Sequence, residues 1–292
     1  MSYFHLNFIL KGKLTVCCLL MLSAIPLNAQ REAKQIGDFK ESISLNEHLR
    51  GTKRTLQYRP DGDEFVCVNG KNRYTRALYG SHSPFRVETS DRPVFAFYNN
   101  GRGGNISFKV ILRDGTELAL DRTGHCESRY SAGKRTYYLT DPSWGKGELR
   151  ISVLALADMD GAIWRFSPSN MPKGAILRWQ HGGATGKRLS RNGDMGVDPA
   201  DCFELPVEAT DLVTGELPLQ KEVYLVRGEV PEDYNVRKLY QQAEAASLAL
   251  ASHLKIETPD PYLNTLGGAL VAAADGIWDG QVWLHGAIGW RM

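Results

Sequence analysis

The chain has 292 residues, of which 42% are hydrophobic and 23% are charged, values typical of a folded globular protein. They exclude an intrinsically disordered chain, a collagen-like repeat and a polytopic membrane protein. The 35 basic residues nearly balance the 33 acidic residues, and the counts become equal once residues 1–29, which hold Lys11 and Lys13 but no acid, are set aside. A neutral chain lacks the basic surface of a general nucleic-acid-binding protein, so we expect no nucleic-acid partner.

Residues 1–29 have the pattern of a secretory signal peptide. The two lysines precede an apolar run from Leu14 to Leu22, after which Pro26 breaks the run and Ala29 supplies a small residue for cleavage. The apolar run is shorter than the ~20 residues that a membrane-spanning helix needs. We therefore expect export to the periplasm or the extracellular space, cleavage near Ala29, and no stable membrane insertion.

Residues 30–230 are predicted to form an antiparallel β-sandwich. Short apolar runs that end in Gly, Asn-Gly or Asp-Gly recur along this stretch, a spacing typical of hairpins. The clearest runs are 64–68, 94–98, 106–112, 149–156 and 222–228. An α/β fold would instead show long helical patterns between the strands, so the predicted fold class is mainly β.

The cysteines of the predicted sandwich, Cys67, Cys126 and Cys202, are far apart and odd in number. They match no metal-binding spacing and allow at most one disulfide. We interpret them as small buried side chains. No metal or cofactor is indicated anywhere in the chain.

Helical patterns begin at Pro231. Residues 233–254 contain no Gly or Pro and repeat apolar side chains every three or four positions, which predicts a linker helix within 231–255. Asp260 and Pro261 then supply an N-cap and a first-turn proline for a second helix, expected to end near Ala274.

Three short motifs fail the spacing of known sites. Residues 181–188 are rich in glycine but depart from a phosphate-binding loop at both ends, so we predict a Gly-rich connection. Residues 158–161 begin like a calcium loop without its later ligands, which favours a turn between strands. Residues 80–83 lack the second glycine of a nucleophile elbow.

Two features of the chain support a resemblance to a known family. One is the order of sandwich, linker helix and second helix, and the other is the sequence of residues 69–80, 85–93 and 278–291. The chain resembles the N-terminal part of secreted bacterial six-hairpin glycosidases, in which a β-sandwich is joined by a helix to an (α/α)6 barrel. In particular, it is similar to an uncharacterised family encoded among polysaccharide-degradation genes. The resemblance implies that residues 256–292 are the truncated start of the barrel.

The resemblance also implies that the acid and base carboxylates of a glycoside hydrolase lie beyond Met292. This portion is then expected to be inactive alone, with a separately encoded barrel as a partner. Carbohydrate is the expected ligand, because tryptophan faces suit the apolar faces of pyranose rings and polar neighbours can bind hydroxyls. The candidate substrate-binding residues are Trp278, Asp279, Trp283 and His285.

Other interpretations remain open. The tryptophans can instead pack between sandwich and barrel, and the chain can be a stand-alone carbohydrate-binding module or a structural support domain without a ligand. If the sandwich itself proves catalytic, the carboxylates to test are Glu88, Asp91, Asp158 and Asp160.

Overall fold

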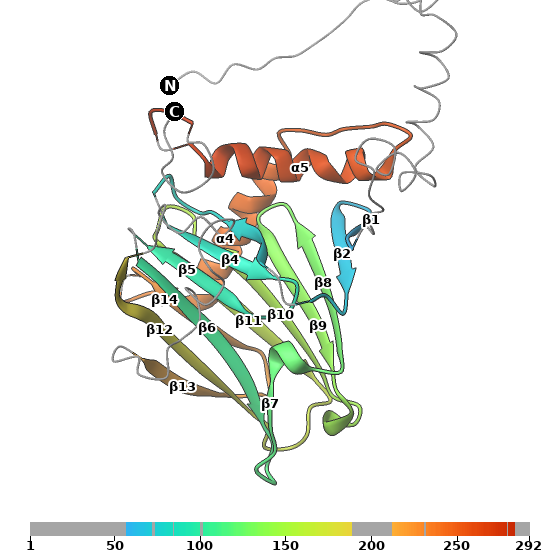
Figure 1. The fold of residues 1–292 in the computed structure, drawn as a ribbon, viewed down its shortest axis with the longest axis vertical. Coiled ribbons are helices and arrows are strands. Elements are labelled where there is room, and N and C mark those ends of the chain that lie inside the picture. The colour runs from blue at the N-terminus through green and yellow to red at the C-terminus, as the bar shows by residue number, and fades with distance from the viewer. Residues whose placement is uncertain are drawn as a thin grey trace, which may run out of the picture. The chain divides into compact units, whose positions relative to one another are not determined.

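The computed structural model of the protein describes residues 57–71, 74–83, 85–99, 102–188, 212–230, 232–278 and 280–283. These residues belong to one compact unit that begins at Gln57. The predicted signal peptide and Cys202 lie outside the described residues. Within them the strands form two antiparallel sheets, followed by two α-helices, so the prediction of a mainly β fold is confirmed (Figure 1).

The first sheet, sheet A, contains seven strands, each antiparallel to its neighbour. In spatial order they are β1 (Arg59–Asp61), β2 (Glu64–Val68), β8 (His125–Ser131), β9 (Lys134–Thr140), β10 (Glu148–Ala155), β11 (Gly161–Ser169) and β14 (Val223–Gly228). Most neighbours in this sheet are also consecutive in the chain, as hairpin connections require.

The second sheet, sheet B, packs face to face with sheet A (Figure 1). Its strands in spatial order are β13 (Val213–Pro218), β12 (Ile176–Arg188), β6 (Arg102–Ile111), β5 (Phe95–Asn99), β4 (Arg86–Ser90) and β3 (Tyr74–Leu78), and β7 (Glu117–Ala119) pairs with β6. Two single-turn 3-10 helices, η2 (Leu120–Arg122) and η3 (Pro142–Trp144), lie in connections between strands.

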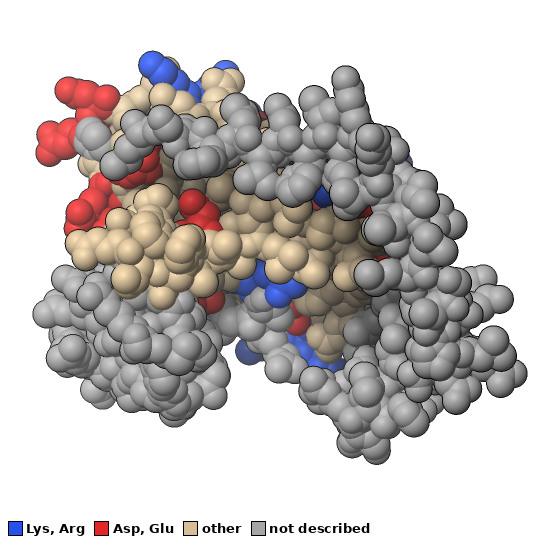
Figure 2. Space-filling view, turned by 90° about the horizontal axis from the view of Figure 1, so that it is seen from above, with Lys and Arg blue, Asp and Glu red and all other residues tan. Residues whose placement is uncertain are grey.

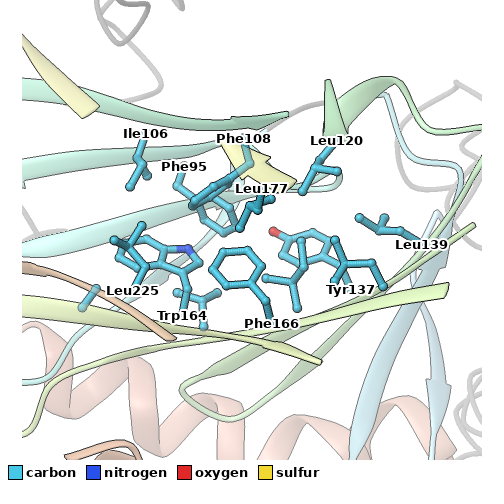
Figure 3. Packing of buried hydrophobic residues seen from close by; sticks show 14 of the residues in the cluster. Phe95, Ile106, Phe108, Leu120, Tyr137, Leu139, Trp164, Phe166, Leu177 and Leu225 are labelled. Carbon is cyan, nitrogen blue, oxygen red and sulfur yellow. The ribbon is translucent and has the colours of Figure 1, made fainter. Parts of the chain in front are cut away.

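Aromatic side chains from both sheets meet in the core between them (Figure 3). Phe95 of sheet B is packed edge to face against Tyr137 and Trp164 of sheet A, with ring centroids 5.7 and 5.6 Å apart. Phe108 of sheet B lies 5.1 Å from Phe166 in the same way. Such pairs add to the large apolar area that each ring buries, so this cluster fixes how the two sheets pack.

Strand β10 is buried on both faces in its second half, where Val153, Leu154 and Ala155 form a continuous apolar run. Leu149, Ile151 and Val153 face the core between the sheets. Leu154 faces the opposite side and joins a second cluster with Ile163 and with side chains of helix α4 (Val236–Ala251). The sequence alternates at Glu148 and Arg150, where one face is partly exposed, and becomes continuously apolar from Val153, where both faces are buried.

Each α-helix begins after a capping side chain, and the sequence predicts the second of these caps. The Asn235 side chain accepts a hydrogen bond from the backbone N–H of Lys238 at 3.0 Å, so α4 starts after Asn235 and is shorter than the predicted 233–254. Asp260 caps helix α5 (Pro261–Gly276) through the N–H of Tyr262 at 2.9 Å, as predicted. Helix α5 lies across one end of the sandwich, where its Thr265 hydroxyl donates to Gly62 O (Figure 1).

Two predictions about short segments have different outcomes. Residues 158–161 form the predicted turn, between β10 and β11. The predicted Gly-rich connection at 181–188 is wrong, because these residues continue strand β12. Gly182 and Gly183 pair with Asn105 and Gly104 of β6, and the register shifts after Gly183. Backbone pairing with a neighbouring strand does not need a side chain, so glycine content alone misidentifies this segment.

No helix among the described residues is both long and apolar enough to cross a membrane. The same residues contain no group of three or more His, Cys, Asp or Glu side chains that could hold a metal ion.

Cys67 and Cys126 are free, buried thiols on adjacent strands. Burial raises the pKa of Cys126 to about 12, so its thiol stays protonated at about pH 8, where exposed cysteines react. We expect iodoacetamide to label Cys126 only after the chain unfolds in urea, as measured by mass spectrometry of its peptide. Equal labelling rates with and without urea would contradict the buried position.

Candidate functional site

The structure brings two of the predicted substrate-binding residues together. Trp278 and Trp283 form an isolated antiparallel bridge just after α5, and their rings lie 4.5 Å apart between centroids at an interplanar angle of 52°. Gly280, with φ of +94°, allows the tight turn between them. Trp278 is partly buried, whereas 67% of Trp283 is exposed. Asp279 and His285, the other two predicted residues, lie outside the described residues.

A pocket of about 270 Å³ lies close to this tryptophan pair, at the end of the sandwich between α4 and α5. Asp275 lines the pocket, and its carbonyl oxygen accepts the backbone N–H of Trp278 at 3.0 Å. We call this space the α4–α5 pocket. Its lining residues are Ala77, Tyr79, Gly80, His82, Tyr130, Gly133, Ala155, Ala157, Asp158, Ala243, Ala246, Ser247, Leu250, Ala272 and Asp275.

One wall of the pocket is the connection between β3 and β4, which is bonded to the turn between β10 and β11. Gly80 accepts the N–H of Asp158 at 3.2 Å, and the hydroxyls of Ser81 and Ser83 both donate to the Asp160 carboxylate. A Cβ at Gly80 would lie 1.7 Å from Leu156 O, so only glycine permits this approach. These contacts hold the intervening His82 at the pocket.

His82 connects this wall to the end of α5. Its Nε2 lies 3.3 Å from Asp275 Oδ1, and both side chains are about half exposed. Beneath them the Tyr79 ring packs against Gly276, where any Cβ would clash with the ring at 2.0 Å. Burial, followed by the nearby Glu88 carboxylate, raises the pKa of Tyr79 above its ordinary value. The Tyr79 hydroxyl therefore stays protonated and can donate a hydrogen bond.

The opposite wall is helix α4, which is fixed by polar contacts to the hairpin of β8 and β9. The Ser247 hydroxyl donates to Ala132 O at 2.6 Å, and Lys134 pairs with Glu244 at 3.1 Å. Between these contacts α4 presents Ala243 and Ala246 to the pocket. The small side chains leave the space empty, while the polar contacts prevent α4 from closing it.

The pocket is acidic among the residues that the structure describes. Asp158 and Asp275 supply two carboxylates, and His82 is the basic residue of the lining. Figure 2 looks onto this end of the sandwich, where most of the described surface is uncharged and acidic side chains gather at the left. The arrangement offers hydrogen-bond acceptors, an imidazole and a phenol around an alanine-rich bed, which suits a small polyhydroxylated ligand.

Of the carboxylates nominated for a catalytic sandwich, Asp158 alone lines this pocket. Glu88 forms a buried ion pair with the Arg86 guanidinium, and Asp91 is enclosed with Arg135 and Tyr58. Asp160 accepts from two serine hydroxyls. These three carboxylates hold the fold together.

Sequence reasoning missed His82, Asp275 and Tyr79. Residues 80–83 lack the pattern of a nucleophile elbow, and the polar composition of that segment is the signal in the sequence that points to His82. Asp275 follows the end expected for the second helix, where nothing in the sequence connects it with a loop about 190 residues earlier.

Comparison with known proteins adds little about function. Residues 100–230, the stretch that contains β6 to β14, match the family model described as "Domain of unknown function (DUF4450)". That match includes Asp158 but excludes His82, helices α4 and α5 and the tryptophan pair. No curated protein matches the chain.

Proposed function

We propose that this chain is an exported carbohydrate-binding protein, and that it represents the β-sandwich, linker helix and first barrel helix of a six-hairpin glycosidase-like hydrolase acting on polysaccharide. The observation that carries the proposal is the Trp278–Trp283 pair close to the α4–α5 pocket, whose alanine-rich lining also holds Asp158, Asp275 and His82. The hydrolytic step is assigned to the barrel portion, because three of the four nominated carboxylates of the sandwich are engaged in structural contacts.

The chemistry of the tryptophan pair supports a sugar ligand. An indole ring carries negative charge density on its faces, which attracts the C–H bonds on the apolar face of a pyranose. Trp283 exposes two thirds of its surface, while the partly buried Trp278 lies against it. A supported, exposed ring loses little conformational freedom when a sugar stacks on it. His82, Asp158 and Asp275 supply the hydrogen-bonding groups that sugar hydroxyls need.

The outer surface of α5 supports the relation to a helical barrel. Leu263 and Leu270 lie two turns apart on α5 and are 44% and 45% exposed. Apolar side chains in one row of a helix are suited to packing against a further helix. Downstream coding sequence with further helices and a pair of carboxylates would support this assignment.

A stand-alone binding module is the second candidate. The tryptophan pair and the pocket both lie within the described unit, so glycan binding does not depend on a barrel. A module would bind glycan in solution without hydrolysing it. A purely structural support domain would do neither, which separates the third interpretation from the other two.

We expect Trp283→Ala to weaken glycan binding by about five- to tenfold, because stacking against one aromatic ring contributes on the order of 1–1.5 kcal/mol. The measurement is affinity electrophoresis against a panel of polysaccharides, followed by calorimetry with those that bind. Stability should change by less than about 1 kcal/mol, because the side chain is mostly exposed.

Leu248→Ala is the matched control, because it removes an exposed apolar side chain (56%) from α4. It should leave glycan affinity unchanged. Equal affinity for the wild type and Trp283→Ala would show that the tryptophan pair is not the sugar platform. Absence of binding across the whole panel would reject carbohydrate binding by this chain.

A further inference from the structure

We propose that the α4–α5 pocket binds a single pyranose unit that carries no acidic group, and that Asp158 and Asp275 exclude uronic and sulfated sugars. This inference rests on the proposed carbohydrate binding and adds the ligand class of the site. It follows from three properties of the pocket: its size, the charge of its lining, and the way its carboxylates are held.

The size of the pocket limits the ligand to one ring. Its volume of about 270 Å³ lies just below the roughly 300–1,000 Å³ of sites for drug-sized ligands. Alanines from β3, from the turn after β10 and from both helices form much of its surface. An apolar bed of this kind suits the C–H face of one pyranose. Further units of a chain would extend towards the tryptophan pair that follows Asp275.

The charge of the lining selects against anions. Asp158 comes from the turn between β10 and β11, and Asp275 comes from the last turn of α5, so two carboxylates belong to different elements of the same pocket. Lys and Arg are absent from the described lining, and the imidazole of His82 already contacts Asp275. A carboxylate or sulfate on the sugar would meet two like charges with no lysine or arginine among the described lining residues, which is unfavourable.

The fold fixes the backbone positions of both acidic residues. Asp158 has φ of +61°, in a turn whose backbone is bonded to Gly80 and whose Asp160 is bonded to two serines. Asp275 is held by α5 and by His82. Because neither element can withdraw without breaking these contacts, both acidic residues remain at the pocket and can act together as a charge filter.

The test compares neutral oligosaccharides with the same oligosaccharides oxidised at C6 to uronates, so that linkage and length are matched. The full chain is titrated with each pair in a calorimeter. We expect each oxidised member to bind at least about tenfold more weakly than its neutral counterpart. Asp158→Asn and Asp275→Asn should each reduce this ratio several-fold, because an amide keeps the hydrogen-bonding shape without the charge.

Asp114→Asn is the control with the same change of charge. Asp114 is exposed in the turn between β6 and β7, and this variant should keep the wild-type ratio. In Figure 1 that turn lies at the end of the sandwich away from α5. Equal or tighter binding of the oxidised sugars would overturn the charge filter and leave carbohydrate binding intact. Equal losses for both members of a pair in the Asn variants would also overturn it. Failure of every neutral and oxidised sugar to bind would remove the proposed function itself.

Discussion

Replacement of Arg135 by methionine should destabilise the protein by about 3–5 kcal/mol, because it removes one partner of a fully buried ion pair. The Arg135 guanidinium spans the two sheets: Nη2 donates to Ser90 O and to Ser128 Oγ, each at 3.2 Å, and lies 3.7 Å from Asp91 Oδ1. Tyr58 donates to the same carboxylate. Without the arginine, the buried Asp91 carboxyl group loses its cationic partner. Urea unfolding followed by tryptophan fluorescence measures the loss.

Two further variants make this expectation specific. Arg178→Met removes an arginine that pairs with Glu117 and Glu216 at 2.9 Å but is 39% exposed, so its cost should stay below about 1 kcal/mol. Adding Asp91→Asn to Arg135→Met should cost less than the sum of the two single changes, because the uncompensated charge disappears. Additive losses in the double variant would show that the two residues do not act as a pair.

The mainly β architecture follows from local patterns in the sequence. Runs such as 64–68 and 149–156 coincide with β2 and, within one residue, with β10, because turn residues interrupt apolar stretches of strand length. The caps at Asn235 and Asp260 are equally local. By contrast, residues 181–188 join a strand despite their glycines, since the partner strand β6 supplies the pairing and is distant in sequence.

The candidate site could be predicted only in part, for the same reason. The tryptophan pair lies within six residues of chain, so its two members were found together. The α4–α5 pocket combines the β3–β4 connection, two hairpin turns and two helices. Arg135 and Asp91 are likewise joined only by the packing of one sheet on the other. Local periodicity in the sequence does not indicate which distant loops come together at the end of a sandwich.

Helix α4 links the stability of the protein to its candidate site, and Tyr240 tests that link. Tyr240 is 2% exposed, its ring lies 4.4 Å from the Arg165 guanidinium carbon, and its centroid is 5.8 Å from that of Tyr224. Tyr240→Ala should cost about 3–5 kcal/mol, as for other large aromatic residues removed from a core. The cation–π contact with Arg165 disappears as well.

In Tyr240→Ala we expect helix α4 to unfold before the two sheets do. Tyr240 and Leu239 are the large side chains with which α4 covers Leu154 and Ile163 of sheet A, whereas the aromatic core lies between the sheets and does not include α4. In Tyr240→Ala the helical circular-dichroism signal should therefore be lost at lower urea concentration than the near-ultraviolet signal of the core. Glycan affinity should fall with the helical signal, because Ala243 and Ala246 of α4 form a wall of the pocket.

Tyr234→Ala, which removes a 41% exposed tyrosine just before α4, should leave all three readouts unchanged. If Tyr240→Ala unfolds in one coincident transition at the wild-type urea concentration, α4 is not held by this contact and the pocket does not depend on it.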